Sequence, residues 1–185
     1  MCPQCARNVT ASVTPWSGGT RLVHVFVLGI DPGLSRCGYG VVEKKGHTTR
    51  AVAAGVIRTS PKTPLPQRLS EMQREFRLLI GEYRPQVVAV ERVLFQVNVR
   101  TAMSVGQASG IAMAEAASAG CDVIEYSPNE IKSAVAGDGA ADKSQMERMV
   151  QMILGIDKPL RPVDAADAIA VALCYLAHSP QLQSR

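Results

Sequence analysis

Aromatic residues are scarce in this chain: phenylalanine, tyrosine and tryptophan together make up 4% of its 185 residues. So few rings argue against a wide stacking surface for single-stranded nucleic acid. Long apolar runs are also missing, because the longest, residues 168–177, is shorter than the roughly 20 residues that cross a bilayer. The first 30 residues lack the continuous apolar core of a secretory signal. We therefore expect no membrane segment and a cytoplasmic location.

Cysteine pairs that would form a disulfide framework are absent as well. The five cysteines are odd in number and scattered along the chain, at positions 2, 5, 37, 121 and 174. Cys2 and Cys5 form a single CxxC with no second pair or histidine cluster downstream, whereas a zinc site needs about four ligands. This pattern fits a reducing compartment.

A strong charge of one sign is lacking too, since 20 Lys and Arg oppose 16 Asp and Glu for a net charge of +4. That mild excess permits an anionic partner without requiring one. With 46% apolar and 19% charged residues, the chain is expected to fold as one globular domain. Residues 1–22 show no apolar period and predict a flexible extension; residues 23–178 form the domain, and residues 179–185 a frayed tail.

Hydrophobic periodicity predicts an α/β domain with a mixed five-stranded sheet and helices on both faces. A β-branched run ending at Asp31 is followed by two segments that read as an antiparallel hairpin. Two further short strands alternate with helices. The expected strands are residues 25–30, 38–43, 51–58, 87–90 and 123–126, and the expected helices are residues 65–83, 98–118, 129–136, 143–154 and 163–178.

Acidic residues follow two of these apolar strands, Asp31 after the first and Glu91 after the fourth. Parallel strands present ligand-binding groups at their carboxyl ends. Taken singly, each acid is equally compatible with a solvated strand end or a turn.

Two more acids, Asp164 and Asp167, lie one turn apart on a helix that is otherwise almost wholly apolar. Asp164 alone fits a helix-capping aspartate better than a ligand. Asp167 falls inside the apolar stretch, where a carboxylate is costly unless it is paired or bound to a metal. Four acids without a histidine or cysteine cluster favour a hard cation, Mg²⁺ or Mn²⁺. Two such ions about 3.5–4 Å apart are the usual arrangement for attack on a phosphodiester.

Several short motifs, in order and with compatible spacing from about residue 25 to 178, resemble RuvC, the family of bacterial Holliday-junction resolvases (crossover junction endodeoxyribonucleases). The motifs are Leu28-Gly29-Ile30-Asp31-Pro32-Gly33, Gly38-Tyr39-Gly40, Glu91-Arg92-Val93, Asn98, Gly106-Gln107-Ala108-Ser109-Gly110, Ala141-Asp142-Lys143-Ser144-Gln145 and Asp164-Ala165-Ala166-Asp167-Ala168.

This resemblance implies a ribonuclease-H-like fold and a homodimer that resolves four-way DNA junctions by paired symmetric nicks, in homologous recombination and DNA repair. It implies a nucleoid-associated protein that works with the RuvA–RuvB branch-migration complex. The family's metal-binding acids fall on Asp31, Glu91, Asp164 and Asp167, with two Mg²⁺ per active site and Mn²⁺ as a substitute. Its two active-site basic positions match Lys132 and Lys143.

Lys143 follows Asp142 and precedes Gln145 in a pattern typical of a capping box. A cation there either offsets charge on a reacting phosphate or is a solvated first-turn lysine. Arg36, Arg92, Arg100 and Asn98 are candidate DNA contacts, although each arginine alone is compatible with ordinary surface charge.

The family commonly carries an aromatic residue three positions after the active-site glutamate, where this chain has Leu94 and then Phe95. Either side chain is expected to enter the opened junction or to pack under the following helix. We expect Phe95 to be the wedge, because stacking beside an unpaired base contributes about 1–3 kcal/mol.

Small residues recur every four positions in the helix of residues 98–118, at Ala102, Gly106, Gly110, Ala114 and Ser118. Glycine costs about 1 kcal/mol inside a helix, so two of them require a close neighbour. The neighbour is the chain's own sheet or a second subunit; the family dimerises through this region, which favours a mixed role.

Two other functions remain open. One is a non-catalytic junction-binding module, and the other is an actin-like or sugar-kinase-like ATP-handling domain, which shares the strand–Asp–turn–hairpin opening. The second usually needs two such domains and another phosphate loop, and 185 residues hold neither.

Overall fold

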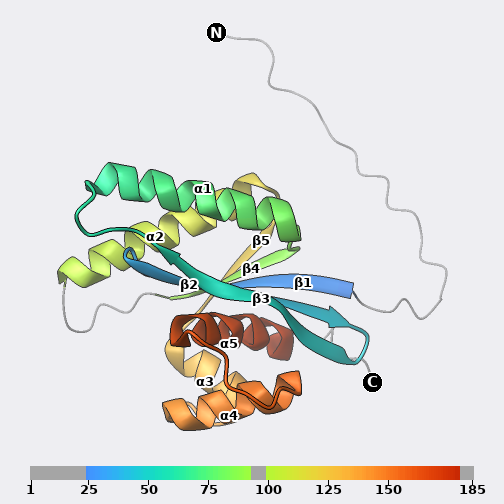
Figure 1. The fold of residues 1–185 in the computed structure, drawn as a ribbon. Coiled ribbons are helices and arrows are strands. Elements are labelled where there is room, and N and C mark those ends of the chain that lie inside the picture. The colour runs from blue at the N-terminus through green and yellow to red at the C-terminus, as the bar shows by residue number, and fades with distance from the viewer. Residues whose placement is uncertain (1–23, 93–98, 180–185) are drawn as a thin grey trace, which may run out of the picture.

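The computed structural model describes residues 24–92 and 99–179, and every statement below concerns that part of the chain (Figure 1). The predicted elements are confirmed there to within about two residues at most ends. The strands are β1 His24–Asp31, β2 Arg36–Lys45, β3 Thr48–Arg58, β4 Val87–Glu91 and β5 Asp122–Tyr126. The helices are α1 Leu65–Tyr83, α2 Val99–Ser118, α3 Pro128–Ala136, α4 Lys143–Leu154 and α5 Val163–His178.

The strands form the mixed five-stranded sheet that the sequence predicted, and their order in it is β3-β2-β1-β4-β5. The pairs β1–β2 and β2–β3 are antiparallel, and β1–β4 and β4–β5 are parallel. The carboxyl ends of β1 and β4 therefore meet at one edge of the sheet. Because β2 begins and β3 ends at that same edge, Arg36 and Arg58 lie opposite each other there.

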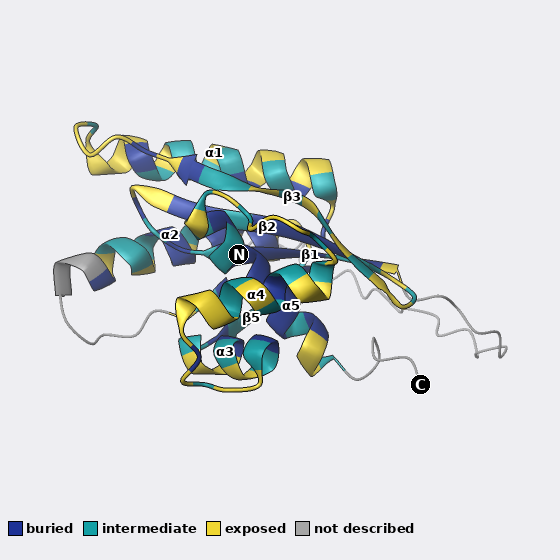
Figure 2. Cartoon of the chain, turned by 60° about the horizontal axis from the view of Figure 1, so that its bottom comes forward, coloured by how far each residue is buried: buried dark blue, intermediate teal, exposed yellow. Residues whose placement is uncertain are grey.

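Helices cover both faces of this sheet (Figure 1). Helices α1 and α2 bury Met72, Phe76 and Ala112 against Leu28 and Val88 on one face. On the other face, α5 packs directly against the strands, with α3 and α4 outside it. Figure 2 shows the buried turns of α5 enclosed in this way, which matches the apolar composition that predicted a buried helix.

Three glycines bring α5 unusually close to the sheet. A Cβ atom at Gly29 would lie 2.0 Å from the Ala168 carbonyl oxygen, and one at Gly38 would lie 2.0 Å from the Asp164 carbonyl oxygen. A Cβ at Gly40 would lie 2.8 Å from the Ile169 nitrogen. The backbone of α5 thus rests on β1 and β2 at distances that only glycine permits. This contact fixes the height of the first two turns of α5 above the sheet edge.

The predicted capping box at the start of α4 is confirmed. The Asp142 carboxylate accepts a hydrogen bond from the Gln145 N–H at 2.8 Å, and the Gln145 side chain accepts one from the Asp142 N–H at 2.8 Å. Both otherwise unpaired backbone donors are satisfied. The cap holds Lys143 in the first turn of α4.

The small-residue stripe of α2 mostly faces away from the chain's own sheet. Gly106 and Gly110 are exposed and would have no atom within 4 Å of an added Cβ, whereas Ala108 and Ala112 bury the opposite face. Of the stripe, Ala102 is buried. The interpretation that these glycines pack against the chain's own sheet is therefore wrong, because α2 turns the opposite face, with Ala108 and Ala112, towards the sheet. No described helix is long and apolar enough to cross a membrane.

We predict opposite effects for two Gly→Ala substitutions. Gly29→Ala should lower the free energy of unfolding by about 2 kcal/mol or more, because α5 must move off β1. Gly81→Ala, at an exposed α1 position with no neighbour within 4 Å, should raise it by about 0.5–1 kcal/mol. Urea denaturation followed by circular dichroism measures both. Equal effects would contradict the close contact of α5 with the sheet.

Candidate active site

The four predicted acids meet at the sheet edge where β1 and β4 end. Asp31 is the last residue of β1 and Glu91 the last of β4, while Asp164 and Asp167 lie in the first two turns of α5. Residues from two strands and one helix, with at least 60 positions between one element's acid and the next, are thus brought together by the sheet order and by the glycine contact under α5.

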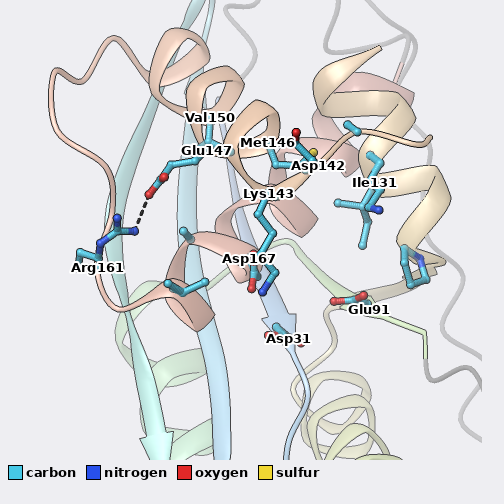
Figure 3. Close-up of a pocket in the computed structure, with 16 residues that line it drawn as sticks. Asp31, Glu91, Ile131, Asp142, Lys143, Met146, Glu147, Val150, Arg161 and Asp167 are labelled. Atoms are coloured by element: carbon cyan, nitrogen blue, oxygen red, sulfur yellow. Dashed lines mark hydrogen bonds and ion pairs between the residues drawn. The ribbon is translucent and has the colours of Figure 1, made fainter. Parts of the chain in front are cut away.

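Three of these acids line a cavity of about 730 Å³ between the sheet edge and α3, α4 and α5 (Figure 3). Asp31, Glu91 and Asp167 lie at one end. The remaining wall is largely apolar and includes Ile131 and Val150. Low polarity around the carboxylates strengthens every charge interaction in the cavity.

Burial and mutual repulsion favour the protonated form of these three carboxyls. Burial, then the charges of Glu91 and Asp167, raise the pKa of Asp31 to about 8. Burial also raises the pKa of Glu91 and of Asp167. A carboxyl group of Asp31 that keeps its proton can share a hydrogen bond with Glu91. Nearby positive charge therefore does not offset the burial of these three carboxyls.

Both predicted lysines lie at this cluster. Lys132 on α3 and Lys143 on α4 line the cavity, and the Lys143 side chain extends towards Asp167 (Figure 3). The charge of Lys132 lowers the pKa of Glu91, and that of Lys143 lowers the pKa of Asp167, against the larger effect of burial. Each lysine compensates its acid only in part.

Asp164 differs from the other three acids. The Arg36 guanidinium at the start of β2 contacts both carboxylate oxygens, with Nη2 donating to Oδ2 and Nε to Oδ1 at 3.4 Å. This hydrogen bond holds the pKa of Asp164 below its usual range, and the charge of Arg58 acts in the same direction. Asp164 thus already has a cation.

The donor set fits a hard divalent ion. The described lining of the cavity offers carboxylate oxygens and contains no histidine or cysteine, which favours Mg²⁺ or Mn²⁺ over zinc. Repulsion among Asp31, Glu91 and Asp167 is the kind that a divalent cation relieves. Within residues 24–92 and 99–179, however, no three acidic, histidine or cysteine side chains are already arranged around one ion. Binding would require these carboxylates to turn towards a common point.

The other predicted contacts have mixed outcomes. Arg92 is exposed beside Glu91 and donates to the Glu125 carbonyl oxygen at 3.4 Å. Arg100 belongs to the first turn of α2. Arg36 is ion-paired with Asp164 instead of being free surface charge. Leu94, Phe95 and Asn98 lie outside the described residues, so their expected roles stay predictions.

Sequence reasoning missed Arg68 on α1, a residue that shapes the site. Its buried guanidinium donates to the hydroxyl of Thr59 at 2.9 Å and to that of Ser35 at 2.7 Å. These bonds fix the connection between Asp31 and Arg36. A signal existed, because Arg68 lies one turn before Met72 on the apolar face of its helix.

A second omission is the ion pair of Glu147 with Arg161, both of which line the cavity (Figure 3). Arg161 belongs to the connection between α4 and α5, where spacing carries no information about partners.

Comparisons with known proteins agree with this geometry. Residues 27–175 match the family model of the crossover junction endodeoxyribonuclease RuvC. The RuvC protein of Salinispora arenicola is 52% identical over 151 residues, which are 81% of this chain and 86% of that protein. The RuvC of Chloroflexus aggregans is 46% identical over 156 residues, 84% of this chain and 95% of that protein.

Solved structures point to the same fold. Thermus thermophilus RuvC in complex with a Holliday junction substrate superposes with a TM-score of 0.79 at 36% identity, covering 84% of this chain and 94% of that one. The yeast mitochondrial Holliday junction resolvase shares the fold with a TM-score of 0.64 at 16% identity, covering 85% of this chain and 80% of that one. The ribonuclease-H-like α/β prediction is confirmed.

We predict that metal-free protein becomes less stable as pH rises. A carboxyl whose pKa is higher folded than unfolded contributes stability below about pH 4 that is lost as pH rises through the folded pKa, here about 8 for Asp31. Asp31→Asn should therefore raise the melting temperature at pH 8 in EDTA by about 2–6 °C and change it little at pH 4.

Asp164→Asn serves as the control of opposite sign. The pKa of Asp164 is lowered in the fold, so this variant should slightly lower the melting temperature at pH 8. Calorimetric melts at both pH values check the pair. An Asp31→Asn variant that is less stable than the parent at pH 8 would contradict the electrostatic account.

Proposed function

Because the chain belongs to the RuvC family of crossover junction endodeoxyribonucleases, we propose that it resolves four-way DNA junctions by paired symmetric nicks in homologous recombination and DNA repair. The observation that carries the proposal is the meeting of Asp31, Glu91, Asp164 and Asp167 at one sheet edge. An ATP-handling domain usually needs a second domain of this kind, whereas residues 24–92 and 99–179 form one five-stranded sheet with acids and lysines at this edge.

In this proposal the four acids hold two Mg²⁺ ions, for which Mn²⁺ can substitute. When bound, the ions activate a water molecule for in-line attack and stabilise the leaving 3′ oxygen. The carboxylates of this chain would supply the oxygen ligands, and the fold sets where they lie, because Asp31 and Glu91 end two paired parallel strands and Asp164 and Asp167 lie on α5. The new bond forms between the water oxygen and phosphorus, and the bond between phosphorus and the 3′ oxygen breaks.

Lys132 on α3 and Lys143 on α4 line the same cavity as the acids, and the Lys143 side chain extends towards Asp167 (Figure 3). A phosphate over the acids would lie between the carboxylates and these ammonium groups. Their charge would oppose the negative charge that develops on the phosphate oxygens during attack. The capping box under Lys143 holds that lysine in place without using its side chain.

Binding of the junction is proposed to use groups that flank the acids. Arg92 is exposed directly after Glu91, and Arg100, Asn98, Leu94 and Phe95 follow it along the chain. Phe95 is proposed as the wedge at the junction centre, with Leu94 as the alternative. The partners proposed are a second copy of the chain and the RuvA–RuvB complex, in the bacterial cytoplasm.

We predict that Asp31→Asn, Glu91→Gln and Asp164→Asn each reduce nicking of a synthetic four-way junction by about a thousandfold or more while leaving junction affinity within a few-fold. Binding rests on phosphate contacts, which these changes retain. Asp167→Asn should be impaired too. Gel assays with and without Mg²⁺ measure nicking, and mobility shifts in EDTA measure affinity.

Glu147→Gln is the matched control, because Glu147 lines the same cavity but is paired with Arg161. It should retain nicking within about threefold, as expected for a surface pair. Nicking by an Asp31→Asn enzyme at the parental rate would refute the metal assignment. Junction binding without Mg²⁺-dependent nicking in the parent would indicate a non-catalytic module.

A separate prediction concerns the homodimer. Gly106 and Gly110 present open space on the outer face of α2, and Met103 beside them is 60% exposed. We propose that this face meets its counterpart on a second copy, since two symmetric strands require two active sites. Gly110→Leu should convert dimers into monomers in sedimentation velocity runs. Gly81→Leu, on α1, should leave the dimer intact. If the Gly110→Leu variant is still a dimer, the outer face of α2 is not the dimer interface.

A further inference from the structure

The cation on Asp164 is the feature of the site that the proposed reaction does not use. Arg36 contacts both oxygens of a carboxylate that the proposed function assigns to metal. Of the four acids, Asp164 is the one that carries such a contact, whereas the other three repel one another. An Arg–carboxylate fork uses the same lone pairs that a metal ion would need.

The fold places Arg36 there through the alternation of β2. Side chains two residues apart point to the same face of a strand. Gly38 faces the Asp164 carbonyl oxygen with no side chain between them. Arg36, two residues earlier, therefore emerges on the same face beside the Asp164 carboxylate.

Arg58 provides a second cation at the same place. It pairs with Arg36 in the β2–β3 register and its charge reaches Asp164, but no hydrogen bond joins it to that carboxylate. The structure thus offers one arginine that occupies the carboxylate oxygens and a neighbour that contributes charge alone.

We propose that Arg36 competes with a metal ion for the Asp164 carboxylate, so that in the DNA-free protein Asp164 joins the metal site only when Arg36 is displaced. Asp31, Glu91 and Asp167 then form the part of the site that attracts the first ion. Asp164 belongs to the part that is completed later. This inference rests on the proposed function for the role of Asp164 as a ligand.

The displacing group follows from the same chemistry. A guanidinium released from Asp164 needs another anion. A DNA phosphate at this edge offers two non-bridging oxygens, which arginine binds in a bidentate way. Arrival of the substrate would then free Asp164 for metal. Arg36 acts here as a positioning residue, because it reaches the reaction through Asp164.

The test counts Mn²⁺ bound to the DNA-free full chain, from the electron paramagnetic resonance signal of the free ion. Arg36→Gln should tighten Mn²⁺ binding by about five- to tenfold relative to the parent, as expected for a lost partly exposed bidentate pair. Arg36→Lys keeps the charge without the fork and should lie between them. Arg58→Gln removes a nearby charge and should change the affinity by less than about twofold.

A double variant isolates the pairwise effect. In an Asp164→Asn background, Arg36→Gln should give no further gain in Mn²⁺ affinity, because the two residues act through one contact. Circular dichroism melts confirm that each variant is folded.

Several results would overturn the inference. They are an unchanged or weakened Mn²⁺ affinity in Arg36→Gln, an equal gain in Arg58→Gln, a gain that persists without Asp164, and no Mn²⁺ binding in any variant. The nicking assay distinguishes failure of this inference about Arg36 from failure of the proposed function. A chain that never nicks a junction but shows the Asp164-dependent gain keeps the inference and loses the function; normal nicking without the gain does the reverse.

Discussion

Helix α5 rests on β1 and β2 at backbone distance because Gly29, Gly38 and Gly40 present no side chain to it. Every other property of the site depends on this contact. It brings two helix-borne acids to the height of two strand-borne acids, so that residues from both ends of the domain share one edge. A single methyl group at one of these glycines would push the acids of α5 away from the acids at the strand ends. The arrangement of the candidate site therefore depends on the absence of a side chain at these positions.

The same closeness makes the site electrostatically costly. Three carboxyls lie in surroundings that raise their pKa values, and the group with the largest shift, Asp31, is the last residue of a strand that is mostly buried. A folded core would be more stable with apolar groups at these positions. Binding of a cation would offset the folding stability that the buried acids cost. The acids at this edge of the sheet then lower the stability of the metal-free protein in favour of function.

The acids at the strand ends were predictable from the sequence because hydrophobic patterning marks where a buried strand stops. Asp167 was predictable because an acid inside an apolar helix needs a partner. Both signals are local. The pairing of Arg36 with Asp164 was not predictable, since 128 positions separate the two residues and their meeting depends on the register of β2. The sequence also could not tell whether the small residues of α2 face the sheet or point away from it, because small residues allow a close contact in either case.

The balance of charge explains why metal and substrate belong together at this site. When all four acids are ionised, as binding of a divalent ion requires, their charges are matched in number by those of Lys132, Lys143, Arg36 and Arg58. Divalent ions added to a neutral cluster would create an excess of positive charge next to basic side chains. Phosphate groups of DNA are the anions able to balance that excess, and their approach would in turn strengthen the hold on the ions. In the proposed function, ion binding and DNA binding at this edge would therefore favour each other, and linkage requires that this coupling be reciprocal.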